Sequence, residues 1–198
     1  MKKTFFTLTL IAFCACGAIA QGISGGIKAG ANFANLKYDS DFGDFSPDSR
    51  TSLHVGFYAT IMVSETFGVQ PELMYNSVGS KFEALGTELT SKLDYLTIPV
   101  MLRYQPVPVF HIHAGPQFGF LMSAKMDDGD DSVDAKDSFK GLDLGLGFGA
   151  GVDLPMGLGL SARYVMGLSD IADGDAAEET KITNTAVQLS LTYKLFGK

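Results

Sequence analysis

The sequence is poor in cysteine, tryptophan and charge. Its 198 residues include no Trp and two Cys, and 19% are charged against 46% hydrophobic. Cys14 and Cys16 lie near the amino terminus, so the chain beyond them has no thiol for a disulfide, a thiolate metal site or a nucleophile. With 15 basic and 22 acidic residues, and no basic cluster after Lys2 and Lys3, nucleic-acid binding is not expected.

Long apolar runs are also missing. After residue 21 no stretch approaches the roughly 18 consecutive apolar residues of a transmembrane helix. The chain nevertheless has a positive mean hydropathy and contains 23 Gly. Soluble acidic domains seldom combine these properties, so a membrane or secreted protein is the leading class.

The amino terminus has the pattern of a signal peptide. Lys2 and Lys3 precede an apolar stretch from Phe5 to Ile19, and Ala18-Ile19-Ala20 is a small-residue cleavage site. We expect residues 1–20 to be removed and residues 21–198 to form one domain. The alternatives are an uncleaved anchor, for which the apolar stretch is short, and a lipidated Cys16.

Beyond residue 21, apolar and polar residues alternate with a period of two. The pattern is clear from Leu53 to Val63, from Phe110 to Phe120 and from Leu142 to Leu154, and it predicts strands with one apolar face. Eight such segments are predicted, over 22–36, 52–63, 67–82, 92–104, 109–122, 139–154, 158–169 and 182–196. Each is long enough for a tilted strand that crosses a bilayer, which needs about 9–11 residues.

The connections alternate between short and long. Short turns are predicted at 64–66, 105–108 and 155–157, and longer loops at 37–51, 83–91, 123–138 and 170–181. Most of the 22 acidic residues lie in or beside the long loops. This layout predicts an all-β fold, an eight-stranded antiparallel up-and-down transmembrane β-barrel with acidic extracellular loops and both termini on the short-turn side.

Aromatic residues are expected to form two belts at the membrane interfaces. Those near the short turns are Phe67, Tyr104, Phe110, Tyr193 and Phe196. Those toward the long loops are Phe33, Tyr75, Phe82, Tyr95, Phe118, Phe120 and Phe139.

Eight strands enclose an interior that side chains fill, so a packed polar lumen is expected. Candidates for its lining are Lys28, Asn32, His54, Gln70, Glu72, Asn76, Asp94, Arg103, His111, His113, Gln117, Asp143, Arg163, Gln188 and Lys194. Because buried charges persist only when paired, we predict a polar network of Glu72, Arg103, Gln117 and Arg163. Within it Glu72 and Arg103, on neighbouring strands, are expected to belong to one ion-pair network, with Arg163 as the second cation. The glycines from Gly145 to Gly151 leave space for long side chains, and bulges are expected at Pro71 and Pro116.

Catalysis, metal binding and cofactors are not expected. His54, His111 and His113 share the lumen, but no spacing of Asp or Glu supports a zinc site beside them. No nucleophile-elbow sequence occurs. The run from Met126 to Asp131 lacks the ligand spacing of an EF-hand and is interpreted as a solvated acidic loop. Weak binding of divalent cations, or of extracellular partners, at the acidic loops stays open. The barrel is expected to be a monomer in outer-membrane lipid.

Several ordered motifs resemble the outer-membrane protein beta-barrel domain family, which includes PorT-like proteins. They are Gly26–Phe33, Val69–Tyr75, Leu93–Val100, Ala114–Gly119, Ala162–Tyr164 and Val187–Tyr193. The resemblance covers nearly all of residues 22–198 and implies a bacterial outer-membrane barrel. PorT-like members are linked to protein secretion, and the family brings no catalytic residues.

The sequence therefore predicts an integral outer-membrane barrel, not an enzyme, with a structural or interaction role. One alternative is a soluble secreted lipocalin-like barrel that holds an apolar ligand and turns its apolar faces inward. Another is a PorT-like accessory factor in secretion. A membrane-embedded hydrolase is opposed by the missing nucleophile constellation, and a pore by the small number of strands.

Overall fold

The computed structural model describes residues 22–40, 47–84, 87–127, 131–173 and 180–197. The predicted signal peptide, residues 1–20, and parts of all four predicted long loops lie outside this set. The strands are β1 (Ile23–Ser40), β2 (Asp48–Met62), β3 (Phe67–Ala84), β4 (Thr87–Val107), β5 (Phe110–Asp127), β6 (Ser132–Asp134), β7 (Leu142–Asp153), β8 (Leu158–Gly167) and β9 (Thr180–Phe196). None of the helical segments in the described ranges is long and apolar enough to cross a membrane.

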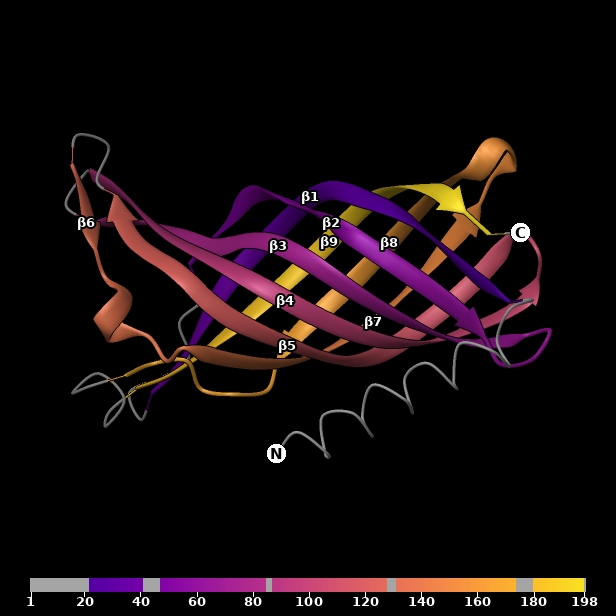
Figure 1. Cartoon of the computed structure of the whole chain (residues 1–198). Helices are drawn as coiled ribbons and strands as arrows, with labels where there is room; N and C mark the ends of the chain where they lie inside the picture. Colours follow the sequence, from indigo (N-terminus) through magenta and orange to yellow (C-terminus); the bar gives the residue numbers. More distant parts are fainter. Residues whose placement is uncertain (1–21, 41–46, 85–86, 128–130, 174–179, 198) are drawn as a thin grey trace, which may run out of the picture.

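Eight of these strands close into an antiparallel barrel (Figure 1). Sequence neighbours pair around the ring, β9 pairs with β1, and the β4–β5 pairing completes the circle. The three-residue β6 only extends the sheet beside the far end of β5. The carboxyl end lies on the short-turn side, opposite β6 (Figure 1). The predicted fold class is confirmed.

Each predicted segment corresponds to one strand of the ring; six of these strands run further into the loops than predicted, whereas β7 and β8 are shorter than predicted. The prediction of a long loop over 83–91 is wrong, because β3 reaches Ala84 and β4 begins at Thr87 in unbroken register. The segment predicted from 139 begins as a strand at Leu142. Backbone ladders continue beyond the alternating segments without an apolar face, so hydrophobic alternation does not detect their ends.

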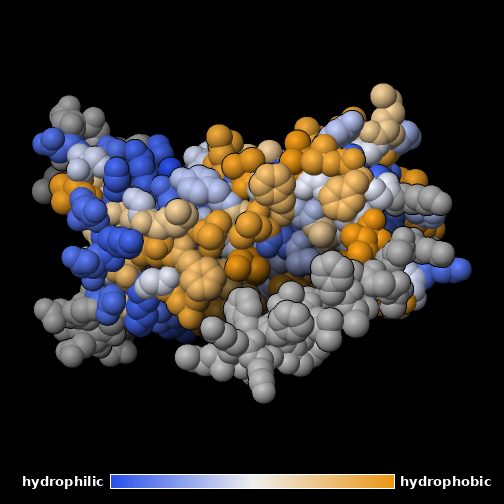
Figure 2. All heavy atoms as spheres, viewed as in Figure 1, coloured by the Kyte–Doolittle hydropathy of each residue, from blue (hydrophilic) through white to orange (hydrophobic). Residues whose placement is uncertain are grey.

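The outward face of the barrel is apolar and the inward face is largely polar. On β9, for example, Val187, Leu189 and Leu191 are exposed, whereas Gln188 and Ser190 are buried. Figure 2 shows the resulting hydrophobic band, with hydrophilic residues gathered at the long-loop end. This orientation is the reverse of the lipocalin-like alternative.

Most of the predicted aromatic belts lie on the outward face. Phe67 and Tyr104 are exposed near the short turns, with ring centroids 4.8 Å apart. The prediction is wrong for Tyr95 and Phe139, which are only 2% and 7% exposed because they face the interior.

The prolines are accommodated without the predicted bulges. The register on either side of Pro71 and of Pro116 is unchanged. Pro71 lies in a short gap of the β2–β3 ladder and at the edge of another in the β3–β4 ladder, and Pro116 lies in a short gap of the β4–β5 ladder. On the other side, Pro71 still pairs with Val100 and Pro116 with Leu146. The missing N–H groups therefore coincide with local gaps in the ladders and not with a change of register, and a closed barrel tolerates such gaps.

Candidate functional site

The interior is layered along the barrel axis. An apolar cap closes the long-loop end. Below it come a layer of amide and hydroxyl side chains, a cluster of charged side chains and a cavity that opens at the short-turn end.

The apolar cap consists of nine buried residues that pack together inside the mouth. They are Leu36, Leu93, Tyr95, Leu121, Ala124, Phe139, Ile171, Ala172 and Ile182. Two segments outside the ring complete it, because Phe139 pairs with Ala172 in an isolated bridge and the Lys140 N–H donates to the Ile171 carbonyl at 2.8 Å. The cap therefore folds over the side where β7 and β8 are short.

Asp170 fixes one of these segments. Its carboxylate accepts hydrogen bonds from Lys140 Nζ at 2.8 Å and from the backbone N–H groups of Ala172 and Ile182 at 3.0 and 2.9 Å. Partial burial alone raises the pKa of Asp170, but these hydrogen bonds outweigh it and hold the pKa below its ordinary value. The ionised carboxylate thus stabilises the cap.

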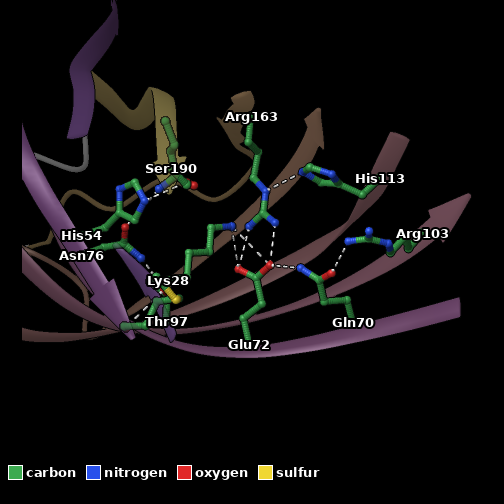
Figure 3. A network of polar contacts seen from close by, with 12 residues as sticks. Lys28, His54, Gln70, Glu72, Asn76, Thr97, Arg103, His113, Arg163 and Ser190 are labelled. Carbon is green, nitrogen blue, oxygen red and sulfur yellow. Dashed lines mark hydrogen bonds and ion pairs between the residues drawn. The ribbon is translucent and has the colours of Figure 1, made fainter. Parts of the chain in front are cut away.

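Below the cap lies a hydrogen-bonded layer centred on His54. Its Nδ1 lies 2.7 Å from Asn32 Oδ1, and its Nε2 lies 2.9 Å from Ser190 Oγ. Gln188 donates to both Asn32 and Asn76 at 3.0 Å, and Asn76 donates to Thr97 Oγ1 at 2.5 Å. The layer joins β1, β2, β3, β4 and β9 (Figure 3).

The order Ser190–His54–Asn32 matches the connectivity of a catalytic triad, which the sequence analysis did not find. However, the three residues are 4%, 1% and 0% exposed. None of them lines the cavity at the short-turn end. A substrate has no described path to the Ser190 hydroxyl. The arrangement therefore stabilises the barrel by hydrogen bonds between β1, β2 and β9.

Glu72 on β3 is the centre of the charged cluster. Arg163, on β8 across the lumen, donates to both of its carboxylate oxygens, at 2.7 and 2.9 Å. Lys28 Nζ lies 3.3 Å from the same oxygens, and Gln70 Nε2 donates to Oε1 at 2.8 Å. The Lys28, Arg163 and Glu72 side chains are 0–2% exposed. The cluster therefore ties opposite walls of the barrel together (Figure 3).

The four residues of the predicted network do not all meet. Arg103 reaches Glu72 only through Gln70, to which its Nη1 donates at 3.0 Å, and its Nη2 pairs instead with Asp153. Gln117 faces the lumen, but its buried Oε1 has no hydrogen-bond partner in the described part of the chain. Lys28 and Asp153 take part in the cluster without having been predicted as partners of Glu72 and Arg103. Asp153 lies an even number of residues from Asp143 on the same strand. Since Asp143 was predicted to face inward, the same alternation could have placed Asp153 inside the barrel.

Asp94 is a correction to the predicted lining. Leu93 and Tyr95 are buried inside the barrel, so the intervening Asp94 faces outward. There it interacts with Tyr75 and Arg50. The sequence alone leads to the same conclusion. Arg103 faces inward, and Asp94 lies an odd number of residues away on the same strand, so it faces outward.

Glycines on β7 make room for the charged and imidazole side chains, as predicted. A Cβ at Gly149 would lie 2.9 Å from His113 Nε2, and one at Gly151 would lie 2.6 Å from two atoms of the His111 ring. These residues are direct partners across the β5–β7 ladder. The imidazoles therefore lie against bare backbone.

The cavity at the short-turn end has a volume of about 440 Å³. Inward residues of most strands line it, among them Thr60, Gln70, Arg103, His111 and Lys194. Within the described ranges, no group of three or more His, Cys, Asp or Glu side chains is placed to hold a metal ion.

Comparison with known proteins supports the architecture. A family model described as outer membrane protein beta-barrel domain matches residues 19–173. Ail, the attachment invasion locus protein of Yersinia pestis, has a similar structure, with a TM-score of 0.52, 14% identity and coverage of 88% of this chain and 99% of Ail. For Neisserial surface protein A the TM-score is 0.53 and the identity 13%, over 88% of this chain and 100% of that protein. The search of curated proteins gives no match. At these identities the structural likeness shows the fold alone.

Proposed function

Because the chain belongs to the outer membrane protein beta-barrel domain family, we propose that it acts as a non-conducting surface protein that works through its extracellular loops. The protein is located in the bacterial outer membrane, and its outward apolar face is the face that contacts lipid. The remaining question is which of its surfaces and spaces carries the function.

The apolar cap is the observation that supports this proposal. Ions and polar solutes that entered the lumen would have to displace Leu36, Leu93, Ile171 and their neighbours, which are 0% exposed. They would then meet the Glu72 cluster, whose charges span the lumen. Breaking a buried pair of this kind costs about 3–5 kcal/mol. Transport through the lumen is therefore disfavoured at two levels.

Catalysis is not part of the proposed role. The Ser190–His54–Asn32 arrangement is enclosed, because its three residues are 4%, 1% and 0% exposed and none of them lines the cavity at the short-turn end. The family and the similar structures are outer-membrane barrels.

The exposed loops are the proposed interaction surface. Their excess of carboxylates favours partners that carry positive charge, and attraction of this kind weakens with salt. Asp134 and Asp137 are exposed on the segment that leads from β6 to the cap. They can be changed without touching the lumen.

Two measurements test the proposal. Purified protein in planar bilayers should give no conductance steps under conditions in which a known porin gives them. Cells that display the protein should bind fluorescent polylysine in a salt-sensitive manner, and Asp134→Asn with Asp137→Asn should reduce this binding. Glu65→Gln, which removes a carboxylate at the opposite end, is the control. Regular conductance steps, or equal binding by all variants, would contradict the proposal.

A role in protein secretion is the second candidate, and the cavity that faces the periplasm favours it. A secretion factor would need a periplasmic surface, and this cavity offers polar and charged groups at that end. Deleting the gene and comparing secreted proteins distinguishes the candidates. A loss of secretion that Asp134→Asn with Asp137→Asn does not reproduce would favour the secretion role.

A further inference from the structure

The cavity at the short-turn end contains hydrogen-bond donors that the protein itself does not use. The Arg103 guanidinium engages Gln70 and Asp153 through its two terminal nitrogens, but its buried Nε–H has no partner in the described part of the chain. Arg103 is 7% exposed and lines the cavity. An unsatisfied buried donor is costly, so such groups usually meet a ligand or water.

His113 supplies a second donor beside the first. Its Nε2 accepts a hydrogen bond from Arg163 Nε at 3.1 Å, so the neutral ring carries its hydrogen on Nδ1. This Nδ1 is buried and has no partner among the described residues. His113 also lines the cavity, and it is the direct partner of Arg103 across the β4–β5 ladder. Side chains so placed have Cβ atoms about 4.5–5.5 Å apart, so one small group can contact both.

The charge of the cluster is not balanced. Lys28, Arg103 and Arg163 carry three positive charges, whereas Glu72 and Asp153 carry two negative ones. At the rim of the cavity Lys194 and Glu65 offset each other. The residual charge of plus one lies in a region shielded from bulk water, where an anion of one charge is most stabilised.

We propose that this cavity binds a small monocarboxylate from the periplasm, whose carboxylate accepts hydrogen bonds from Arg103 Nε and His113 Nδ1. A carboxylate has two acceptor oxygens and a charge of minus one, which suits both the donors and the imbalance. A phosphate dianion would leave an excess negative charge. The volume of about 440 Å³ lies in the usual range of small-molecule sites, roughly 300–1,000 Å³, and leaves room for a short apolar tail beside Tyr58 and Met62.

The three histidines of the chain provide the test. We would label the imidazole nitrogens with ¹⁵N, refold the full barrel in a zwitterionic detergent free of carboxylates, and titrate sodium propionate. The resonances of His113 should shift saturably. His54 is the internal control, because both of its ring nitrogens are already occupied by Asn32 and Ser190. Sodium chloride at equal ionic strength should have no such effect, and inorganic phosphate should bind more weakly than propionate.

Two variants separate the buried donor from general attraction. Arg103→Met removes the Nε–H and the residual charge and should weaken propionate binding at least about tenfold, because a charge-assisted hydrogen bond to the carboxylate is lost. Lys194→Met removes one positive charge from the rim alone and should change the affinity less than about threefold, as expected for a screened surface charge. Heat-modifiable migration on gels would verify that each variant is folded.

The proposal is overturned if propionate shifts His54 as much as His113, if chloride produces the same shifts, or if phosphate binds more tightly than propionate. Folded Arg103→Met that binds like wild type overturns it as well. Should Arg103→Met fail to fold, the proposal is still tested by comparing the propionate-induced shifts of His113 and His54 in the wild-type protein.

Discussion

Replacing Glu72 with Gln would leave Lys28 and Arg163 buried without their carboxylate. Arg163 donates to Glu72 at 2.7 and 2.9 Å, and Lys28 lies 3.3 Å from both carboxylate oxygens. Removing one partner of a buried ion pair typically costs about 3–5 kcal/mol, because the remaining charges stay desolvated. We therefore expect Glu72→Gln to lower the free energy of unfolding by about 3–5 kcal/mol.

Urea unfolding of the barrel in lipid vesicles measures this loss, and heat-modifiable migration on gels gives an independent melting profile. Asp94→Asn is the matched control. It removes the same charge from the outward face of the adjoining strand, where a surface carboxylate contributes about 0–1 kcal/mol. If Glu72→Gln unfolds like the wild type, or Asp94→Asn loses as much, the reasoning about the luminal cluster is wrong.

A double variant distinguishes pairing from simple burial. Arg163→Met combined with Glu72→Leu replaces both charged partners by apolar side chains, a change that is often neutral when the pair is removed together. The double variant should lose less than the sum of the single changes, by about 0.5–3 kcal/mol. Additive losses would show that Glu72 and Arg163 do not stabilise the barrel as a pair.

Three further predictions concern other layers of the interior. Gly151→Ala should destabilise the barrel by about 1–3 kcal/mol, since the new Cβ would lie 2.6 Å from the His111 ring, while Gly141→Ala, with no atom within 4 Å, should be close to neutral in the same urea assay. A fluorophosphonate probe should not label Ser190 in the folded protein, and labelling seen by mass spectrometry would contradict its enclosure. Because the pKa of Asp170 is lowered in the folded state, its stabilisation should be complete at neutral pH and disappear as the pH falls through that lowered pKa, below about pH 4. Asp170→Asn should remove this part of the acid dependence of unfolding, and an unchanged pH profile would contradict it.

The ring of strands could be predicted because hydrophobic alternation is strongest where lipid and lumen face each other across one strand. The same alternation gave the inward position of Glu72, Arg103 and Arg163. It did not give their pairing, since Arg163 lies across the lumen and the match depends on the tilt and stagger of the strands. Arg103 does not pair with Glu72; it pairs with Asp153, which lies at the end of β7.

The apolar cap was missed for a different physical reason. Leu93, Tyr95 and Leu121 are apolar residues at inward positions, and sequence reasoning assigned apolar side chains to lipid. Phe139 and Ile171 come from segments between strands, whose folding back over the mouth no local period encodes. The inward position of Leu93 and Tyr95 could have been predicted, because both lie an even number of residues from the inward-facing Arg103 on the same strand. For Phe139 and Ile171 the sequence held no comparable signal.

A scan of accessibility along β9 tests whether the lumen is closed toward the outside and open toward the periplasm. Single cysteines with spin labels from Ile182 to Lys194 would be compared for relaxation by oxygen, which enters lipid, and by a water-soluble nickel reagent. We predict that Val187, Leu189 and Leu191 are accessible to oxygen, that Ile182 and Gln188 are protected from both, and that Thr192 and Lys194 are accessible to nickel. Nickel access at Ile182 and Gln188 would reveal a continuous aqueous path and contradict the account.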